Sequence, residues 1–159
     1  MDPREKVKEE LKRLKLEGEI IELDQSTATA PAAAEALEVA VGQIAKSILM
    51  ITQEEPLLLV TSGDAKISSS KVKKELGKKA RMAKPHEVQE ITGFEVGGVC
   101  PFALEEGLSL YVDENVKRYP RVYVGAGTGN TVAPITYQQL LQLGAKPGDF
   151  CELVEEVAD

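Results

Sequence analysis

The sequence predicts a mixed α+β fold with helices packed outside a mixed sheet. Its 159 residues suffice for one domain with a sizeable core, and 43% of them are hydrophobic. Predicted strands and helices alternate irregularly, and several neighbouring strands are close enough in sequence to form hairpins. This order favours a mixed sheet over a doubly wound parallel sheet. We therefore expect residues 1–159 to form a single domain.

The first predicted elements are a helix and a short strand. Residues 4–16 have an amphipathic pattern that places Val7, Leu11 and Leu14 on one face of a helix. A strand is expected at residues 19–23.

A second helix and a hairpin follow. Hydroxyl side chains and a proline in segment 26–31 predict a helix that continues through Leu37. We expect a short helical turn at residues 41–45. Strands rich in Ile, Leu and Val are predicted at 47–51 and 57–61, and the short connection between them suits a hairpin.

Three further helices carry local start and stop signals. The segment 68–77 begins with serines and ends in glycine, and Pro85 opens a helix that ends near Gly93. A last helix runs from Thr136 to Leu143. Strands are predicted at residues 108–112, 122–124 and 130–135, the last at an edge or bulge because it contains Pro134.

Cysteine, histidine and hydropathy patterns argue against several classes of protein. Cys100 and Cys151 lack metal-ligand spacing, and His86 is the single histidine, so a Cys/His zinc site is essentially excluded. No apolar stretch reaches transmembrane length, and the charged N-terminus lacks an apolar signal region. We expect a cytoplasmic protein with no metal, no other cofactor and no membrane partner.

Charge is distributed unevenly along the chain. The net charge of −7 argues against indiscriminate binding of nucleic acid. Residues 66–84, however, carry eight basic side chains and one acidic side chain, a net charge of +7, which leaves −14 for the rest. Two interpretations stay open: a solvated helix face, or a local landing site for a phosphate backbone.

Lys46 lies in a run of small, amide and aliphatic residues, positions 41–51. Burying its ammonium without a partner would cost several kcal/mol or force the amine to become neutral. Lys46 therefore either reaches solvent from the end of a strand or lines a pocket that receives an anion.

Two glycine-rich segments suit backbone recognition of a ligand. In residues 93–102, Gly97, Gly98 and Pro101 suit a rigid turn with outward-pointing N–H groups, although such a pattern alone is more often a plain surface turn. Residues 124–131 lack the lysine and spacing of a P-loop. They predict either a hairpin turn between two strands or a pocket wall made of small residues.

Catalysis by a side-chain nucleophile is not indicated. The sequence has no Ser/His/Asp set, His86 is expected to face solvent in the first turn of a helix, and a cysteine such as Cys100 is more often an apolar filler. An enzyme with this sequence would act by binding and backbone polarisation.

Three segments together resemble the bacterial prolyl-tRNA synthetase editing-domain family, also called YbaK-like: residues 42–47, 92–101 and 125–131. The resemblance covers about residues 19–144, and the threonines of segment 26–30 fit it. It implies a curved, partly barrel-like mixed sheet flanked by helices. It also implies trans-editing, the hydrolysis of an amino acid wrongly attached to tRNA.

The resemblance implies roles for individual residues. Lys46 would engage the 3′ end of the charged tRNA, and Gly97 and Gly98 would hold the aminoacyl carbonyl through backbone amides. Further candidates for substrate binding are Thr27, Thr29, Val99, Cys100, Pro101, Gly127 and Thr128. Thr128 stands where some relatives carry a histidine or aspartate that gates substrate size. Candidates for tRNA binding are Lys66, Lys71, Lys74 and Lys78.

The leading hypothesis is thus a free-standing aminoacyl-tRNA deacylase acting on a small amino acid such as alanine, serine, threonine, cysteine or proline. Its partners would be the 3′ aminoacyl end and acceptor stem of mischarged tRNA, with an aminoacyl-tRNA synthetase as a further candidate. One alternative is a non-catalytic module that binds tRNA ends or a small anion. Another is a nucleotide-binding protein that uses the loop of residues 125–130.

Overall fold

The structure, a computed structural model, describes residues 3–16, 20–24, 29–94, 97–102, 104 and 108–154. Its largest sheet has five strands in the order β5–β2–β3–β6–β9. These strands are β5 (Arg81–Met82), β2 (Ala45–Ile51), β3 (Leu57–Ser62), β6 (Ser109–Asp113) and β9 (Lys146–Gly148). β2 is antiparallel to β5 and β3, whereas β6 is parallel to β3 and β9. The predicted mixed sheet is confirmed.

Two smaller antiparallel sheets accompany it, one in the order β1–β8–β7 and one that pairs β10 with β4. Their strands are β1 (Ile21–Glu22), β8 (Thr131–Ile135), β7 (Val122–Gly125), β10 (Cys151–Leu153) and β4 (Ala65–Ile67). A backbone bridge between Ile44 and Tyr123 links the start of β2 to β7. The sheets form no closed ring in the described residues, so the partly barrel-like description is not confirmed.

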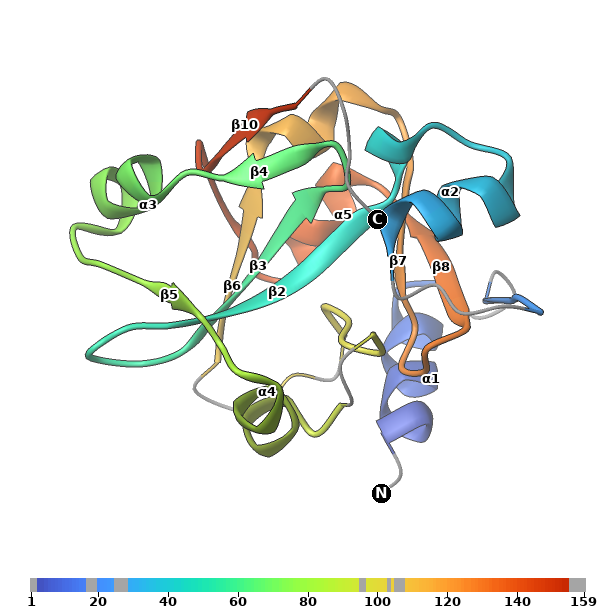
Figure 1. Cartoon of the computed structure of the whole chain (residues 1–159). Coiled ribbons are helices and arrows are strands. Elements are labelled where there is room, and N and C mark those ends of the chain that lie inside the picture. Colours follow the sequence, from blue (N-terminus) through green and yellow to red (C-terminus); the bar gives the residue numbers. More distant parts are fainter. Residues whose placement is uncertain are drawn as a thin grey trace.

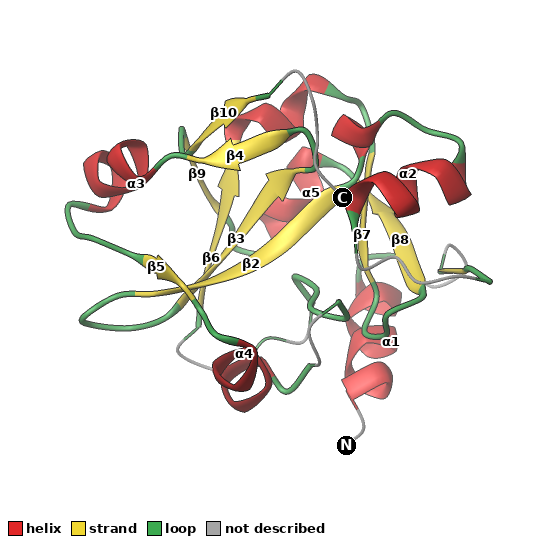
Figure 2. Cartoon of the chain, in the orientation of Figure 1, coloured by secondary structure: helices red, strands yellow, loops and turns green. Residues whose placement is uncertain are grey.

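Helices lie around the sheets, as Figures 1 and 2 show. They are α1 (Pro3–Arg13), α2 (Ala30–Leu37), α3 (Ser69–Leu76), α4 (Pro85–Thr92) and α5 (Tyr137–Gln142), with the 3-10 turns η2 (Val41–Gln43) and η3 (Glu114–Arg118). All five α-helices were predicted, because local signals define their ends. The Ser68 hydroxyl accepts a hydrogen bond from the Lys71 N–H, and Gly77 ends α3 in the left-handed conformation. Among the described residues, no helix combines the length and apolar character that a membrane crossing requires.

The core explains why β3 lies at the centre. All six residues of β3 are buried, and Val7 and Leu11 of α1 pack into the main core at 1% and 0% exposure. Pro134 is tolerated in β8 because β1 pairs only with Thr131 and Val132. β8 lies between β1 and β7 in its sheet, so the prediction that Pro134 places this strand at an edge is wrong. At Pro134 itself, β7 is the paired neighbour in the described residues.

Candidate functional site

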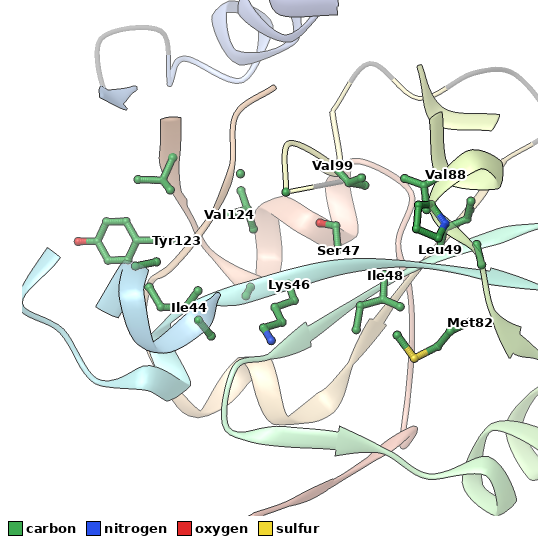
Figure 3. A pocket seen from close by; sticks show the side chains of 18 residues that line it. Ile44, Lys46, Ser47, Ile48, Leu49, Met82, Val88, Val99, Tyr123 and Val124 are labelled. Carbon is green, nitrogen blue, oxygen red and sulfur yellow. The ribbon is translucent and has the colours of Figure 1, made fainter. Parts of the chain in front are cut away.

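A cavity of about 350 Å³ opens beside β2. Its walls come from segments far apart in sequence: the strand itself, the β5–α4 connection, the loop around Gly97, strand β7 and helix α2 (Figure 3). The side chains that line it are mostly aliphatic, and they include Leu49, Val88, Val99 and Val124. Lys46 and Ser47 are polar residues in this lining.

The cavity lies against an edge of β2 that has no strand beside it in the described residues. β5 pairs with Met50 and Ile51, and the bridge to β7 is at Ile44, so the stretch between them is open on this side. The Ala83 N–H donates to the Leu49 carbonyl, 3.0 Å away. Backbone groups point to alternate edges along an antiparallel strand. The N–H and C=O of Ser47 therefore point to the same edge as those of Leu49, which places them at the cavity.

The two faces of β2 present different side chains to the cavity. Because side chains alternate along a strand, Lys46 and Ile48 lie on one face and Ser47 and Leu49 on the other. Figure 3 shows this separation, with the Lys46 amine and the Ile48 side chain on the side opposite Ser47. Leu49 belongs to the main core, whereas Ile48 packs on a second cluster around Met50.

Lys46 is half-buried and lines the cavity, as the second of its two predicted settings requires, and the binding of an anion there stays a prediction. In the described part of the chain its ammonium has neither an ion-pair partner nor a hydrogen bond. A cation in this position attracts an anion or a strong acceptor that enters the cavity.

Ser47 contributes a hydroxyl without a partner. Its Oγ is buried and makes no hydrogen bond in the structure; among the described residues, Ser62 Oγ shares this state. Ser47 lines the cavity and Ser62 does not. Buried polar atoms are normally paired, and an unpaired one costs about 1–3 kcal/mol. Ser47 was not singled out from the sequence.

The two predicted glycine loops touch each other. A Cβ on Gly98 would lie 3.2 Å from the Gly127 carbonyl oxygen, and a Cβ on Gly125 would lie 3.0 Å from the Val99 carbonyl oxygen. Gly97 and Gly127 have φ values of 95° and 103°, a region that strongly favours glycine. The glycines thus let two loops approach backbone to backbone, and Gly97 and Val99 line the cavity as a result.

The other predicted substrate-binding residues that the structure describes are not part of the cavity lining. The Thr29 hydroxyl caps α2 by accepting from the Ala32 N–H at 3.2 Å. The Thr128 hydroxyl bonds to Asn130 Oδ1 at 3.0 Å and to Thr131 Oγ1 at 2.7 Å. Residues Gly98, Cys100 and Pro101 are buried, Gly127 is half-buried, and Thr27 lies outside the described residues. Residues 126–130 connect β7 to β8, as the predicted hairpin turn requires.

Cys100 is held as a neutral thiol. It is 0% exposed, and burial raises the pKa of this thiol to about 12. Its Sγ donates to the Phe102 carbonyl at 3.7 Å. A nucleophilic cysteine needs an accessible thiolate, so Cys100 is not suited to that role. His86 is exposed, as expected.

The predicted tRNA-binding lysines fall into two groups. Lys71 pairs with Asp149 at 3.1 Å and Lys78 with Glu54 at 2.9 Å. The hydrogen bond to Asp149 raises the pKa of Lys71, and the one to Glu54 raises that of Lys78. Lys66 and Lys74 are exposed and have no ion pair among the described residues. Part of the charge of segment 66–84 is therefore neutralised within the protein.

Several cavity residues had no clear signal in the sequence. Met82, Ala83, Pro85 and Val88 line the cavity because β5 pairs with the end of β2, and Tyr123 lines it because β7 lies at the start of β2. Among the described residues no group of three or more His, Cys, Asp or Glu side chains is placed to hold a metal ion.

Comparison with known proteins defines the class. The family model of the aminoacyl-tRNA editing domain matches residues 24–143. The chain is similar to the uncharacterized protein YwhH of Bacillus subtilis, at 39% identity over 125 residues, 78% of this chain and 80% of that protein. It is also 32% identical over 94 residues, 58% of this chain, to the proline–tRNA ligase of Lactiplantibacillus plantarum, of which the match covers 16%.

Among solved structures, the chain resembles that of a protein proposed to be a trans-editing enzyme for prolyl tRNA synthetase. The TM-score is 0.85 and the identity 34%, over 96% of this chain and 98% of that one. The mixed α+β fold is therefore shared with that protein. This chain belongs to the aminoacyl-tRNA editing domain family.

Proposed function

We propose that this chain is a free-standing deacylase that hydrolyses the ester of a small amino acid wrongly attached to tRNA. The observation that carries the proposal is that Lys46 and Gly97, from separate segments, line one small cavity with aliphatic walls. The family match and the similarity to proline–tRNA ligases support aminoacyl-tRNA as the substrate. A synthetase is a candidate partner on the same grounds.

Lys46 positions the substrate in this proposal. Its ammonium has no partner in the described residues, and the 3′ end of tRNA brings phosphate and ribose oxygens that can accept from it. A lysine ammonium is a compact charge with three donors and suits this role as an anchor. Lys46 then fixes the ester relative to the glycine loop without forming a covalent bond.

Hydrolysis needs few groups because an aminoacyl ester is already activated. Water adds to the carbonyl carbon, the bond from that carbon to the ribose oxygen breaks, and the proton lost by water ends on the ribose oxygen. The products are the free amino acid and the tRNA with its ribose hydroxyl restored. Backbone N–H groups of the loop 97–99 are the candidate donors to the developing oxyanion, and one such donor is typically worth about 3 kcal/mol.

Cavity size supports a small amino acid. A volume of about 350 Å³ lies near the lower end of ligand pockets. The valines and leucine around it limit the side chain to a small one. Within segment 66–84, the ion pairs of Lys71 and Lys78 make the exposed Lys66 and Lys74 the better candidates to contact the acceptor stem.

The test is a panel of tRNAs charged with alanine, serine, threonine, cysteine or proline. Release of the amino acid is measured with the protein and in buffer alone. We expect at least one small amino acid to be released faster with the protein. If none is, the deacylase proposal is wrong.

A non-catalytic module remains the second candidate. It is favoured because the described cavity lining holds no histidine, aspartate or glutamate that could act as a base to activate a hydroxyl such as that of Ser47. Binding of a charged tRNA, measured on the same panel, separates the two proposals. Tight binding without accelerated release supports the binding module.

A further inference from the structure

Met82 is an exposed hydrophobic side chain at the cavity. Among the described residues, the large hydrophobic side chains that are exposed are Met82, at 61%, and Leu153, at 51%. Met82 lines the cavity and Leu153 does not. A single exposed apolar side chain is ordinary by itself. Met82 is of interest because it lies in the lining of the cavity together with Ile48 and Lys46.

Strand pairing places Met82 on the same face as Lys46. Met82 lies directly opposite Met50, and opposite residues of an antiparallel pair point to the same side. Met50, Ile48 and Lys46 alternate along β2 and share that side. Figure 3 shows the Met82 thioether, the Ile48 side chain and the Lys46 amine all below the strand. The three side chains line the cavity together.

The spacing of these side chains matches a nucleotide. Residues two apart on a strand are separated by about 7 Å, and neighbouring strands by about 5 Å. Ile48 and Met82 thus form an apolar shelf about one base wide, with the Lys46 ammonium beyond it. A cation beside an apolar shelf is complementary to a phosphate and ribose joined to a flat base.

We propose that Ile48 and Met82 bind the face of the terminal base of tRNA while Lys46 holds its sugar or phosphate. The inference rests on the proposed function and adds a site for the nucleotide. A cavity of about 350 Å³ takes the aminoacyl group, which leaves the base at the rim. The thioether of methionine is flexible and polarizable and makes favourable contacts with aromatic rings.

The neighbouring charges leave the shelf accessible. Arg81 donates to both carboxylate oxygens of Glu87, at 2.8 and 2.9 Å, so this pair is satisfied within the protein. Met82 projects from the two-residue edge strand β5, which has β2 as its partner in the described residues. Its exposed surface is therefore free to meet a base.

The first test uses the wild-type protein with ¹³C-labelled methionine methyl groups. The chain has three methionines, at positions 1, 50 and 82, so the spectrum is simple. We expect adenosine 5′-monophosphate to shift the Met82 methyl signal, because a stacked base changes its ring-current environment. Ribose 5-phosphate carries the sugar and phosphate without the base, and we expect it to leave that signal in place.

The second test is the kinetics of M82A on a hydrolysed mischarged tRNA, with L153A as the matched control. We expect the KM of M82A to rise about three- to tenfold while kcat changes less than twofold, and L153A to behave as the wild type. The proposal that Ile48 and Met82 bind the terminal base requires both results, and failure of either one contradicts it. If the wild type hydrolyses no tRNA of the panel, the proposed function is wrong. The methyl titration alone then tests whether a base binds at Met82.

Discussion

The two faces of β2 serve the same cavity with different chemistry. One face presents Lys46 and Ile48 and continues to Met82, so it combines a cation with an exposed apolar surface. The other presents Ser47 between Ala45 and Leu49, within the main core. The first face suits the charged and flat parts of a nucleotide. The second suits a small aminoacyl group, which must shed water to enter.

If the proposed function holds, this difference lets one strand separate the anchoring of tRNA from the selection of the amino acid. Alternation puts neighbouring residues on opposite faces, and the open edge of β2 lets a ligand reach both. Changes on the Lys46 face should therefore affect the capture of tRNA in general. Changes on the Ser47 face should affect the preference among amino acids.

Lys46→Ala should have the largest effect. Because the substitution removes the proposed anchor, we expect kcat/KM for deacylation to fall about 10²–10³-fold, the scale of losing one key polar contact in an active site. Lys46 has no ion pair in the described residues, so the free energy of unfolding in urea should change by less than about 1 kcal/mol. The control is Lys12→Ala, an exposed lysine of helix α1 that lies outside the cavity lining and outside segment 66–84. Full activity of Lys46→Ala would remove the assigned role.

Gly98→Ala should have an intermediate effect. The added Cβ would lie 3.2 Å from the Gly127 carbonyl oxygen, so the loop must move by a few tenths of an ångström. Because reaction rates are sensitive to such misplacement, we expect kcat to fall about tenfold. Gly129→Ala is the matched control, since a Cβ there meets no atom within 4 Å. Equal activity of the two variants would show that the contact between the loops does not position the substrate.

Local signals made the helices predictable from the sequence. Ser68, Thr136 and the glycines after the helices act through groups a few residues away, so their effect is visible in the sequence. The strands β4, β5, β9 and β10 were missed. Each has two or three residues and is defined by the partner it pairs with, which no local pattern reveals.

The same distinction holds for the site. Lys46 and Gly97 could be singled out because an isolated lysine and adjacent glycines are unusual within their own segments, whereas Val99 followed only from the family resemblance. Met82 and Tyr123 line the cavity only because the fold carries them to β2. Ser47 is an ordinary strand residue in sequence, and only its burial marks it.

Ser47→Ala and Ser62→Ala separate stability from selection. Each removes a buried hydroxyl without a partner, so we expect the free energy of unfolding to stay the same or rise by up to about 1 kcal/mol in both. Only Ser47 lines the cavity, and its hydroxyl can turn between staggered rotamers to meet a substrate group. We expect Ser47→Ala to lower the ratio of seryl to alanyl hydrolysis about three- to tenfold, and Ser62→Ala to leave it unchanged. An unchanged ratio in both variants would exclude the hydroxyl from selection.

Cys100→Ala should have the smallest effect on activity, below about twofold, because its thiol stays protonated and does not line the cavity. A large loss of kcat with intact folding would contradict this.

The effect of Cys100→Ala should instead be seen in the pH dependence of the free energy of unfolding. Burial raises the pKa of the thiol from 9.0 to about 12 in the folded protein, so the unfolded chain releases its proton first as pH rises. The free energy of unfolding should therefore fall between pH 9 and 12. Cys100→Ala should reduce that fall without abolishing it, because burial also raises the pKa of Cys151 to about 12.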